Sequence, residues 1–148
     1  MNNISYRKAT LDDIQTTAEI ALLLYDEHTF DEIFEENLDL LAKDSKVMFL
    51  AFDGKKTVGF SHCSLRYDYV EGTHGGIIGY LEGIYVLAEY RKQGIAKTLV
   101  TICEKWAKDK GCSEFASDCQ LNNIDSYNFH MRIGFEEANR MICFVKKL

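Results

Sequence analysis

The spacing of apolar residues is helical over most of residues 11–41. A weak alternation at 4–8 comes first and predicts a strand. Thr10 followed by Asp13 is typical of a helix start, because both side chains can accept hydrogen bonds from unpaired backbone N–H groups. The pattern therefore predicts one helix over 11–25 and a second over 30–41. The side of the second helix opposite its apolar residues is acidic, with Asp31, Glu32, Glu35, Glu36 and Asp39.

Beyond these helices the period changes to that of strands. Residues 47–52 and 57–69 are predicted to form two strands, joined by a hairpin turn at Asp53-Gly54. A glycine-rich loop over 71–76 leads into an apolar strand over 80–87.

The last third of the chain alternates between helices and strands. A helix is predicted from Gly94 to about Gly111, a natural helix-ending residue. A strand at 115–119, a short helix at 125–133 and a final strand at 141–146 complete the order β-α-α-β-β-β-α-β-α-β. Without repeats or linkers, we expect one domain of residues 1–148, with an α/β fold and a mixed central sheet flanked by helices.

Composition and charge limit the class of protein. Hydrophobic residues make up 47% and charged residues 27% of the chain, as in ordinary globular proteins. No apolar run reaches the roughly 20 residues that span a bilayer, and the N-terminus lacks signal-peptide architecture. The net charge of −6 argues against a nucleic-acid binder. It suits a cationic substrate, although acidity also serves solubility.

The cysteines favour a reducing compartment. There are five, an odd number, and no two of them form a C-x-x-C pair. We expect reduced, mostly buried thiols of a cytoplasmic protein, without a disulfide framework and without a metal site.

The most informative segment is the start of the helix that follows strand 80–87. Small residues at Gly94 and Ala96 let the backbone approach a ligand closely, and the first N–H groups of a helix are unpaired. Together with the helix dipole they predict a cradle for a pyrophosphate. The spacing R-x-x-G-x-A is neither the dinucleotide fingerprint nor a P-loop.

This spacing resembles the acetyl-CoA pyrophosphate loop of the N-acetyltransferases of the GNAT superfamily, whose element order is the one predicted above. The resemblance implies that acetyl-CoA is the cosubstrate. It implies loop contacts from Arg91, Lys92, Gln93, Gly94, Ile95, Ala96 and Lys97.

Glu82 and Gly83 interrupt the apolar strand, and a glycine inside a strand often marks a bulge. In the GNAT superfamily a bulge here splays two strands, and acetyl-CoA enters the opening. The resemblance implies that the backbone of Ile84, Tyr85 and Val86 binds the pantetheine arm. It further implies that the Val86 N–H stabilises the developing oxyanion.

Two carboxylates are candidates for the chemistry on the acceptor amine. Asp118 ends strand 115–119, which the fold would make the parallel neighbour of the Glu82 strand. Carboxylates at adjacent strand ends can face one cleft and hold one ammonium group. The alternatives are a solvated strand carboxylate for Glu82 and a turn aspartate for Asp118.

A second segment, 122–135, resembles the other CoA motif of the superfamily, N-x-x-A-x-x-L-Y-x-K-x-G-F. Asn123 falls on the asparagine, and Gly134-Phe135 match outright. His130 replaces the tyrosine that often protonates the departing thiolate, so it is a candidate general acid. Packing is the alternative for His130.

Further motifs resemble one subgroup, the aminoglycoside 6'-N-acetyltransferases. They lie at 62–72, 81–87, 111–118 and 134–137, and the match spans roughly residues 22–144. The resemblance implies an antibiotic pocket and a homodimer. The pocket would be lined by Tyr25, His28, Tyr69, Glu82, Asp118 and Asn139. Packing is the alternative for Tyr25 and His28, and Asn139 stands where an acidic contact is expected.

The sequence thus predicts an acetyl-CoA-dependent aminoglycoside 6'-N-acetyltransferase that confers antibiotic resistance. Glu82 would be the general base and Asp118 would orient the amine. Two alternatives stay open: an acetyltransferase for another polyamine or a peptide amine, and a non-catalytic CoA-binding module. Nucleic acid and membrane are not expected partners.

Overall fold

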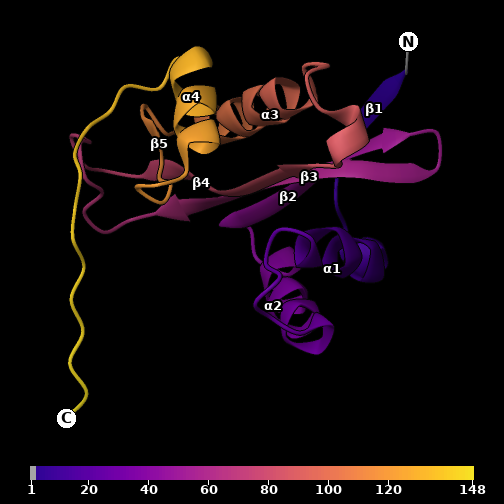
Figure 1. Cartoon of the computed structure of the whole chain (residues 1–148), viewed down its shortest axis with the longest axis horizontal. Coiled ribbons are helices and arrows are strands. Elements are labelled where there is room, and N and C mark those ends of the chain that lie inside the picture. The colour runs from indigo at the N-terminus through magenta and orange to yellow at the C-terminus, as the bar shows by residue number, and fades with distance from the viewer. Residues whose placement is uncertain (1–2) are drawn as a thin grey trace.

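The structure, a computed structural model, describes residues 3–148 (Figure 1). Within that range there are five strands and four α-helices, with single 3-10 turns at Leu11–Asp13 and Ala88–Tyr90. The elements in order are β1 (Ile4–Lys8), α1 (Ile14–Leu22), α2 (Phe30–Leu41), β2 (Lys46–Asp53), β3 (Lys56–Arg66), β4 (Ile78–Val86), α3 (Ile95–Asp109), β5 (Phe115–Ser117) and α4 (Ile124–Arg132).

The strands form one sheet in the order β1-β2-β3-β4-β5. Neighbours among β1 to β4 are antiparallel, and β5 runs parallel to β4. Figure 1 shows α1 and α2 on one side of the sheet and α3 with α4 on the other. The predicted α/β fold with a mixed sheet flanked by helices is therefore confirmed.

Two apolar cores hold these layers together, one on each face of the sheet. In β2, Val47 and Phe49 belong to the core beneath α3, and Met48 and Leu50 to the core beneath α1 and α2. A strand buried on both faces reads as a continuous apolar run, which is the pattern of β2. The sheet is thus a rigid central layer that fixes where β4 ends.

The predicted capping at Thr10 and Asp13 is present, and the start of α2 has a capping arrangement that the sequence analysis did not name. Asp13 accepts the Thr10 N–H at 2.8 Å and pairs with Arg7 through two contacts of 2.8 Å. Its hydrogen bonds to Arg7 lower the pKa of Asp13 to about 2. At the start of α2, Thr29 and Glu32 exchange backbone-to-side-chain hydrogen bonds.

The structure corrects the ends of two predicted strands and shows that a third predicted strand is absent from residues 3–148. The strand predicted over 57–69 ends at Arg66, and the strand predicted over 115–119 ends at Ser117. The final strand predicted over 141–146 is wrong, since no residue there is in a strand. A strand needs a neighbour to receive its backbone hydrogen bonds, and within the described chain nothing pairs with this segment.

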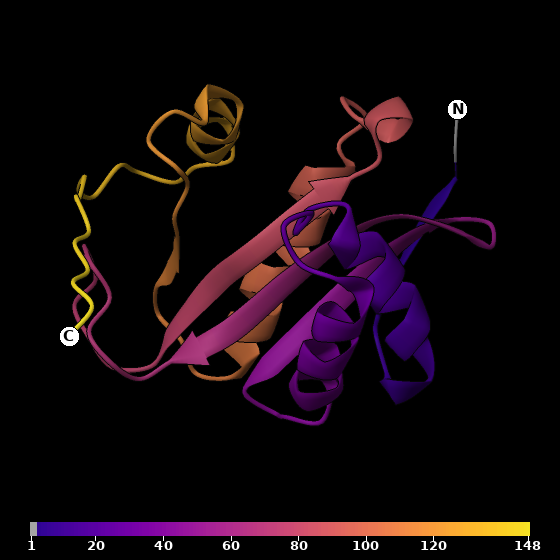
Figure 2. The same cartoon turned by 60° about the horizontal axis from the view of Figure 1, so that its bottom comes forward.

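The most consequential irregularity lies between β3 and β4. His62 pairs with Gly83, yet the next residue, Cys63, pairs with Leu81, so Glu82 is an extra residue on β4. The predicted bulge is confirmed. β5 pairs with β4 only from Gly79 to Leu81, and Figure 2 shows the two strands diverging beyond that point.

Candidate active site

Glu82 projects from the bulge and is held by side chains of β3. The Arg66 guanidinium contacts both of its oxygens: Nε and Nη2 lie 3.0 and 2.5 Å from Oε1, and Nη2 lies 3.0 Å from Oε2. Ser64 Oγ donates to Oε1 at 3.2 Å. Glu82 keeps 24% of its side chain exposed, so the carboxylate is anchored and still accessible.

Asp118 follows directly after β5 and is tied to the same cluster through Tyr80. The Tyr80 hydroxyl donates a hydrogen bond to Asp118 Oδ2. Burial, and then this hydrogen bond, raise the pKa of Tyr80. The Arg66 guanidinium lies over the Tyr80 ring, 3.5 Å from its centroid. The two predicted carboxylates are therefore linked through Arg66 and Tyr80.

Tyr25, from the loop after α1, lies against the bulge itself. A Cβ atom on Gly83 would come within 2.2 Å of the Tyr25 hydroxyl. Burial, then the charges of Glu82 and Glu36, raise the pKa of Tyr25 to about 12. Its phenol is therefore protonated at neutral pH and can donate a hydrogen bond beside Glu82.

His62 lies on the same stretch of β3, at the bulge, and was not among the predicted residues. Burial lowers the pKa of His62 to about 4, although the negative charge of Glu82 acts in the opposite direction and raises it. Its imidazole is therefore neutral at pH 7. Its Nε2 is buried and has no hydrogen-bond partner among residues 3–148.

The close approach of Tyr25 to Gly83 gives a direct test of the bulge geometry. We expect Gly83→Ala to lower the free energy of unfolding by about 1–3 kcal/mol, because the added methyl overlaps the Tyr25 oxygen. Tyr25→Phe in the Gly83→Ala background should recover part of that loss, since the ring carbon Cζ is 3.2 Å away. Thermal and urea unfolding of the single and double variants measure both effects. Additive losses would contradict the contact.

The loop between β4 and α3 has the backbone of an anion-binding site. Lys92 and Gly94 both have positive φ, 62° and 83°, and successive N–H groups in such turns make concave anion sites. Gly94 precedes α3, and no side chain of the described residues caps that helix. The first N–H groups of α3 are thus available to a phosphate. That the pyrophosphate of acetyl-CoA binds there stays a prediction.

The side chains of this loop have structural roles of their own. Arg91 Nε donates to the Val86 carbonyl at 2.9 Å, and its guanidinium lies 5.3 Å from the Tyr85 ring centroid. Ile95 is buried in the core beneath α3, whereas Lys92, Gln93 and Lys97 are exposed. Arg91 therefore fixes the loop to the end of β4.

Gly94 can be tested against a matched control, Gly111 at the end of α3. Both have positive φ, 83° and 94°, and an added Cβ meets nothing within 4 Å at either position. We expect Gly94→Ala and Gly111→Ala each to lose about 1–2 kcal/mol of stability from backbone strain. Calorimetry should show that only Gly94→Ala weakens acetyl-CoA binding, by about tenfold or more. Equal affinities for the two variants would count against the cradle.

Asn123 and His130 belong to α4. The Asn123 side chain caps the helix, with Oδ1 accepting the Ser126 N–H at 3.1 Å. His130 Nδ1 lies 2.7 Å from the Ser126 carbonyl oxygen, which can only accept, so Nδ1 carries the proton. Its Nε2 lies 2.8 Å from Ser117 Oγ. Both ring nitrogens are thus engaged by the protein, which favours packing for His130; a role as general acid stays a prediction.

Three predicted pocket residues make no contact with the cluster of Glu82, Arg66, Tyr80 and Asp118 among the hydrogen bonds and ion pairs of residues 3–148. His28 is half exposed and lies 3.4 Å from Glu32. Tyr69 is 75% exposed, in the loop after β3. Asn139 Nδ2 donates to Glu71 at 2.6 Å. Within residues 3–148, no hydrogen bond or ion pair joins these three to Glu82 or Asp118, so their roles remain predictions.

Arg66, Ser64 and Tyr80 are the site residues that the sequence reasoning missed. A signal was available, because Ser64 and Arg66 are two apart and share a face of β3. Their pairing with Glu82 depended on the bulge, which sets the register between β3 and β4.

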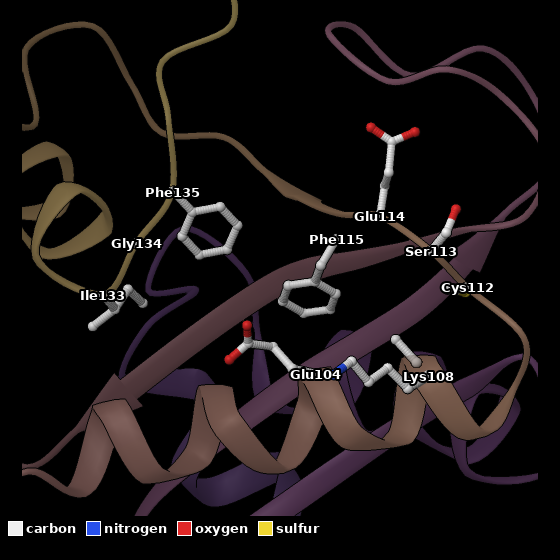
Figure 3. Close-up of a pocket in the computed structure, with 10 residues that line it drawn as sticks. Glu104, Lys108, Cys112, Ser113, Glu114, Phe115, Ile133, Gly134 and Phe135 are labelled. Carbon is white, nitrogen blue, oxygen red and sulfur yellow. The ribbon is translucent and has the colours of Figure 1, made fainter.

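A separate cavity of about 260 Å³ lies between α3, β5 and the end of α4. Phe115 and Phe135 face each other across it, with Ile133, Glu104 and Lys108 at its sides (Figure 3). None of its lining residues is a predicted site residue.

Residues 3–148 contain neither a candidate membrane-spanning helix nor a candidate metal site. No helix there combines the length and apolar character needed to cross a membrane. No three His, Cys, Asp or Glu side chains are grouped so that they could hold a metal ion.

Comparison with known proteins places this arrangement among acetyltransferases. The sequence pattern of the acetyltransferase (GNAT) family matches residues 11–135. An aminoglycoside N(6')-acetyltransferase type 1 from Acinetobacter genomosp. 13 is 41% identical over 128 residues, which cover 85% of this chain and 86% of that protein.

Two solved structures are also similar over nearly the whole chain. The aminoglycoside N-acetyltransferase AAC(6')-Iy in complex with CoA has a TM-score of 0.95 at 30% identity, covering 100% of this chain and 97% of that one. AAC(6')-Iy with the bisubstrate analogue CoA-S-monomethyl-acetylneamine has a TM-score of 0.94 at 31% identity, covering 99% of each chain.

Proposed function

Because the chain belongs to the acetyltransferase (GNAT) family, we propose that it transfers an acetyl group from acetyl-CoA to the 6'-amine of aminoglycoside antibiotics and so confers resistance. Relatives at 36–41% identity carry the name aminoglycoside N(6')-acetyltransferase. The structural neighbour AAC(6')-Iy was solved in complex with the bisubstrate analogue CoA-S-monomethyl-acetylneamine.

The observation that carries this proposal is the linked pair of carboxylates at the bulge. Glu82 and Asp118 come from neighbouring parallel strands and share one network through Arg66 and Tyr80. Aminoglycosides are polycations, so an acidic site on a chain of net charge −6 is complementary to them.

The donor side of the site fits acetyl-CoA. Beyond Leu81, β4 has no β5 partner, which supports binding of an extended pantetheine arm along Ile84 to Val86. The uncapped start of α3 supports binding of the pyrophosphate. When bound, acetyl-CoA supplies the activated acetyl group as a thioester.

In the proposed mechanism, Glu82 takes a proton from the acceptor ammonium, directly or through water, and frees the amine lone pair. Asp118 orients that amine, and the Val86 N–H stabilises the oxyanion that develops on the thioester carbonyl. The C–N bond forms as the C–S bond breaks, and CoA leaves as a thiolate that takes its proton from water or from the incoming ammonium. Holding both substrates in line makes an acyl-enzyme unnecessary. The five cysteines, all free thiols, need no nucleophilic role.

Substitution of the two carboxylates should have different kinetic effects. Glu82→Gln keeps the shape but removes the base, so we expect kcat to fall roughly one hundred-fold. Asp118→Asn removes a charge that faces an ammonium, so the KM for the acceptor should rise as well. Steady-state kinetics with saturating acetyl-CoA and varied aminoglycoside separate the effect on kcat from the effect on the KM for the acceptor. An unaltered kcat for Glu82→Gln between pH 6 and 9 would remove Glu82 as the base.

Acceptor selectivity tests the proposed substrate class. Aminoglycosides with a 6'-amine should be acetylated, and analogues with a 6'-hydroxyl should be poor acceptors. Their binding should weaken as salt rises, because screening weakens ion pairs at the exposed cleft. Release of free CoA, followed across both sets of compounds, measures this. Much faster turnover of spermidine or of a peptide N-terminus would contradict the aminoglycoside assignment.

We also propose that the protein is a homodimer and that it is cytoplasmic. Each chain would be a single domain of residues 1–148. Support for the dimer comes from the C-terminal segment, which we call the arm and define as residues 136–148. Asn139 fixes its beginning to Glu71, yet its apolar residues are exposed. Their exposed fractions are 67% for Met141, 80% for Ile142, 90% for Phe144 and 96% for Val145.

A second copy of the chain would cover this surface. β5 is one of the two edge strands of the sheet, and the cavity beside it is lined by apolar and charged residues, among them Phe115, Phe135, Glu104 and Lys108. An extended segment can add to a sheet edge through backbone hydrogen bonds. The proposed occupant of this edge and cavity is the arm of the other copy.

Charged residues in the arm should therefore separate the copies. We expect size-exclusion chromatography with light scattering to report a dimer for the full chain and a monomer for the double variant Ile142→Asp, Phe144→Asp. Leu121→Asp is the matched control, since Leu121 is 74% exposed outside the arm, and it should stay dimeric. A monomeric full chain at micromolar concentration would contradict the proposal.

A further inference from the structure

Arg66 is a site cation that contacts Glu82 directly and lies over Tyr80, whose hydroxyl is bonded to Asp118. It lies at the end of β3, with 43% of its side chain exposed. Three of its nitrogen–oxygen distances to Glu82 are 3.0 Å or shorter. A bidentate contact of this kind fixes the orientation of a carboxylate as well as its charge environment.

The contacts are distributed unequally between the two oxygens of Glu82. Oε1 receives Arg66 Nε, Arg66 Nη2 and Ser64 Oγ, whereas Oε2 receives only Arg66 Nη2. A carboxylate oxygen has two lone-pair sites. Oε1 is therefore fully used, and Oε2 keeps one lone pair that no described side chain fills.

Arg66 is itself held in place by Tyr80. Its guanidinium lies 3.5 Å from the centroid of the Tyr80 ring, and the hydroxyl of that ring donates to Asp118. Stacking on an aromatic face and a forked contact with a carboxylate both need the planar guanidinium, which lysine lacks.

We propose that Arg66 is a positioning residue for the acetyl transfer: it anchors Glu82, mainly through Oε1, and leaves one lone pair of Oε2 to accept the proton of the acceptor amine. The inference rests on the proposed role of Glu82 as general base. Without the anchor, Glu82 would sample other rotamers and the proton-accepting oxygen would be misplaced. Misplacement of about 1 Å can cost a hundredfold in rate.

The test is a double-mutant cycle between Arg66 and Glu82 with a 6'-amine aminoglycoside and acetyl-CoA. Arg66→Gln should lower kcat by about 10- to 100-fold, with the Kd for acetyl-CoA unchanged by calorimetry. Arg66→Lys should recover only part of the rate. Because Arg66 acts through Glu82, Arg66→Gln should cause no further loss in the Glu82→Gln background.

Arg7 is the matched control. It also forms a forked pair, with Asp13, and lies over an aromatic ring, 4.8 Å from the centroid of Phe52. Arg7→Gln should therefore lose a similar ion pair and keep the wild-type kcat.

Each outcome discriminates. A wild-type kcat for Arg66→Gln, or losses that add in the double variant, would overturn the role of Arg66 while Glu82→Gln still lost activity. A fall in kcat of equal size for Arg7→Gln would show a general effect of lost ion pairs and would also overturn it. An unaltered kcat for Glu82→Gln would instead show that Glu82 is not the base, and the positioning role of Arg66 would be rejected with it.

Discussion

The break in register between β3 and β4 is the constraint on which the candidate site depends. One extra residue, Glu82, is accommodated opposite His62 and Cys63. Beyond that point β4 continues to Val86 without a β5 partner. The same irregularity thus leaves backbone groups of β4 available for an extended ligand and places a carboxylate beside them. An apolar core packs against each face of the sheet. The gap between the ends of β4 and β5 therefore lies within a rigid layer.

Charge in the site is organised around a cation held between carboxylates. Arg66 contacts Glu82 directly and reaches Asp118 through the Tyr80 hydroxyl. Tyr25 completes this side of the bulge with a phenol whose pKa is raised to about 12. The protein therefore has preorganised acceptors at the bulge, where the proposed amine would lose its proton. The proposed acetyl-CoA side consists of backbone groups at the unpaired end of β4 and at the uncapped start of α3. An acidic acceptor side and a backbone-lined donor side suit a reaction that transfers an acetyl group from a thioester to a polycation.

The parts of this arrangement that local sequence encodes were predictable. Gly83 in an apolar run indicated the bulge, and Gly94 indicated the loop before α3; both are single-residue backbone requirements. The contact of Arg66 with Glu82 was not predictable, because it depends on a register that the bulge itself shifts. The strand predicted at 141–146 failed for a related reason: alternation describes a segment able to pair, and its pairing partner is not within the described chain. Tyr69 and Asn139 were placed in the antibiotic pocket by resemblance to the aminoglycoside 6'-N-acetyltransferases, and the contacts of this chain do not test that role.

The central claim is that this site directs acetyl transfer to one particular amine. It is tested most directly by the structure of the product. The protein should be incubated with acetyl-CoA labelled with carbon-13 in the acetyl group and with an aminoglycoside that carries several amines. Two-dimensional NMR of the product then identifies the acetylated nitrogen. The account predicts a single label on the 6' nitrogen. Acetylation of another amine, or of several without preference, would contradict it.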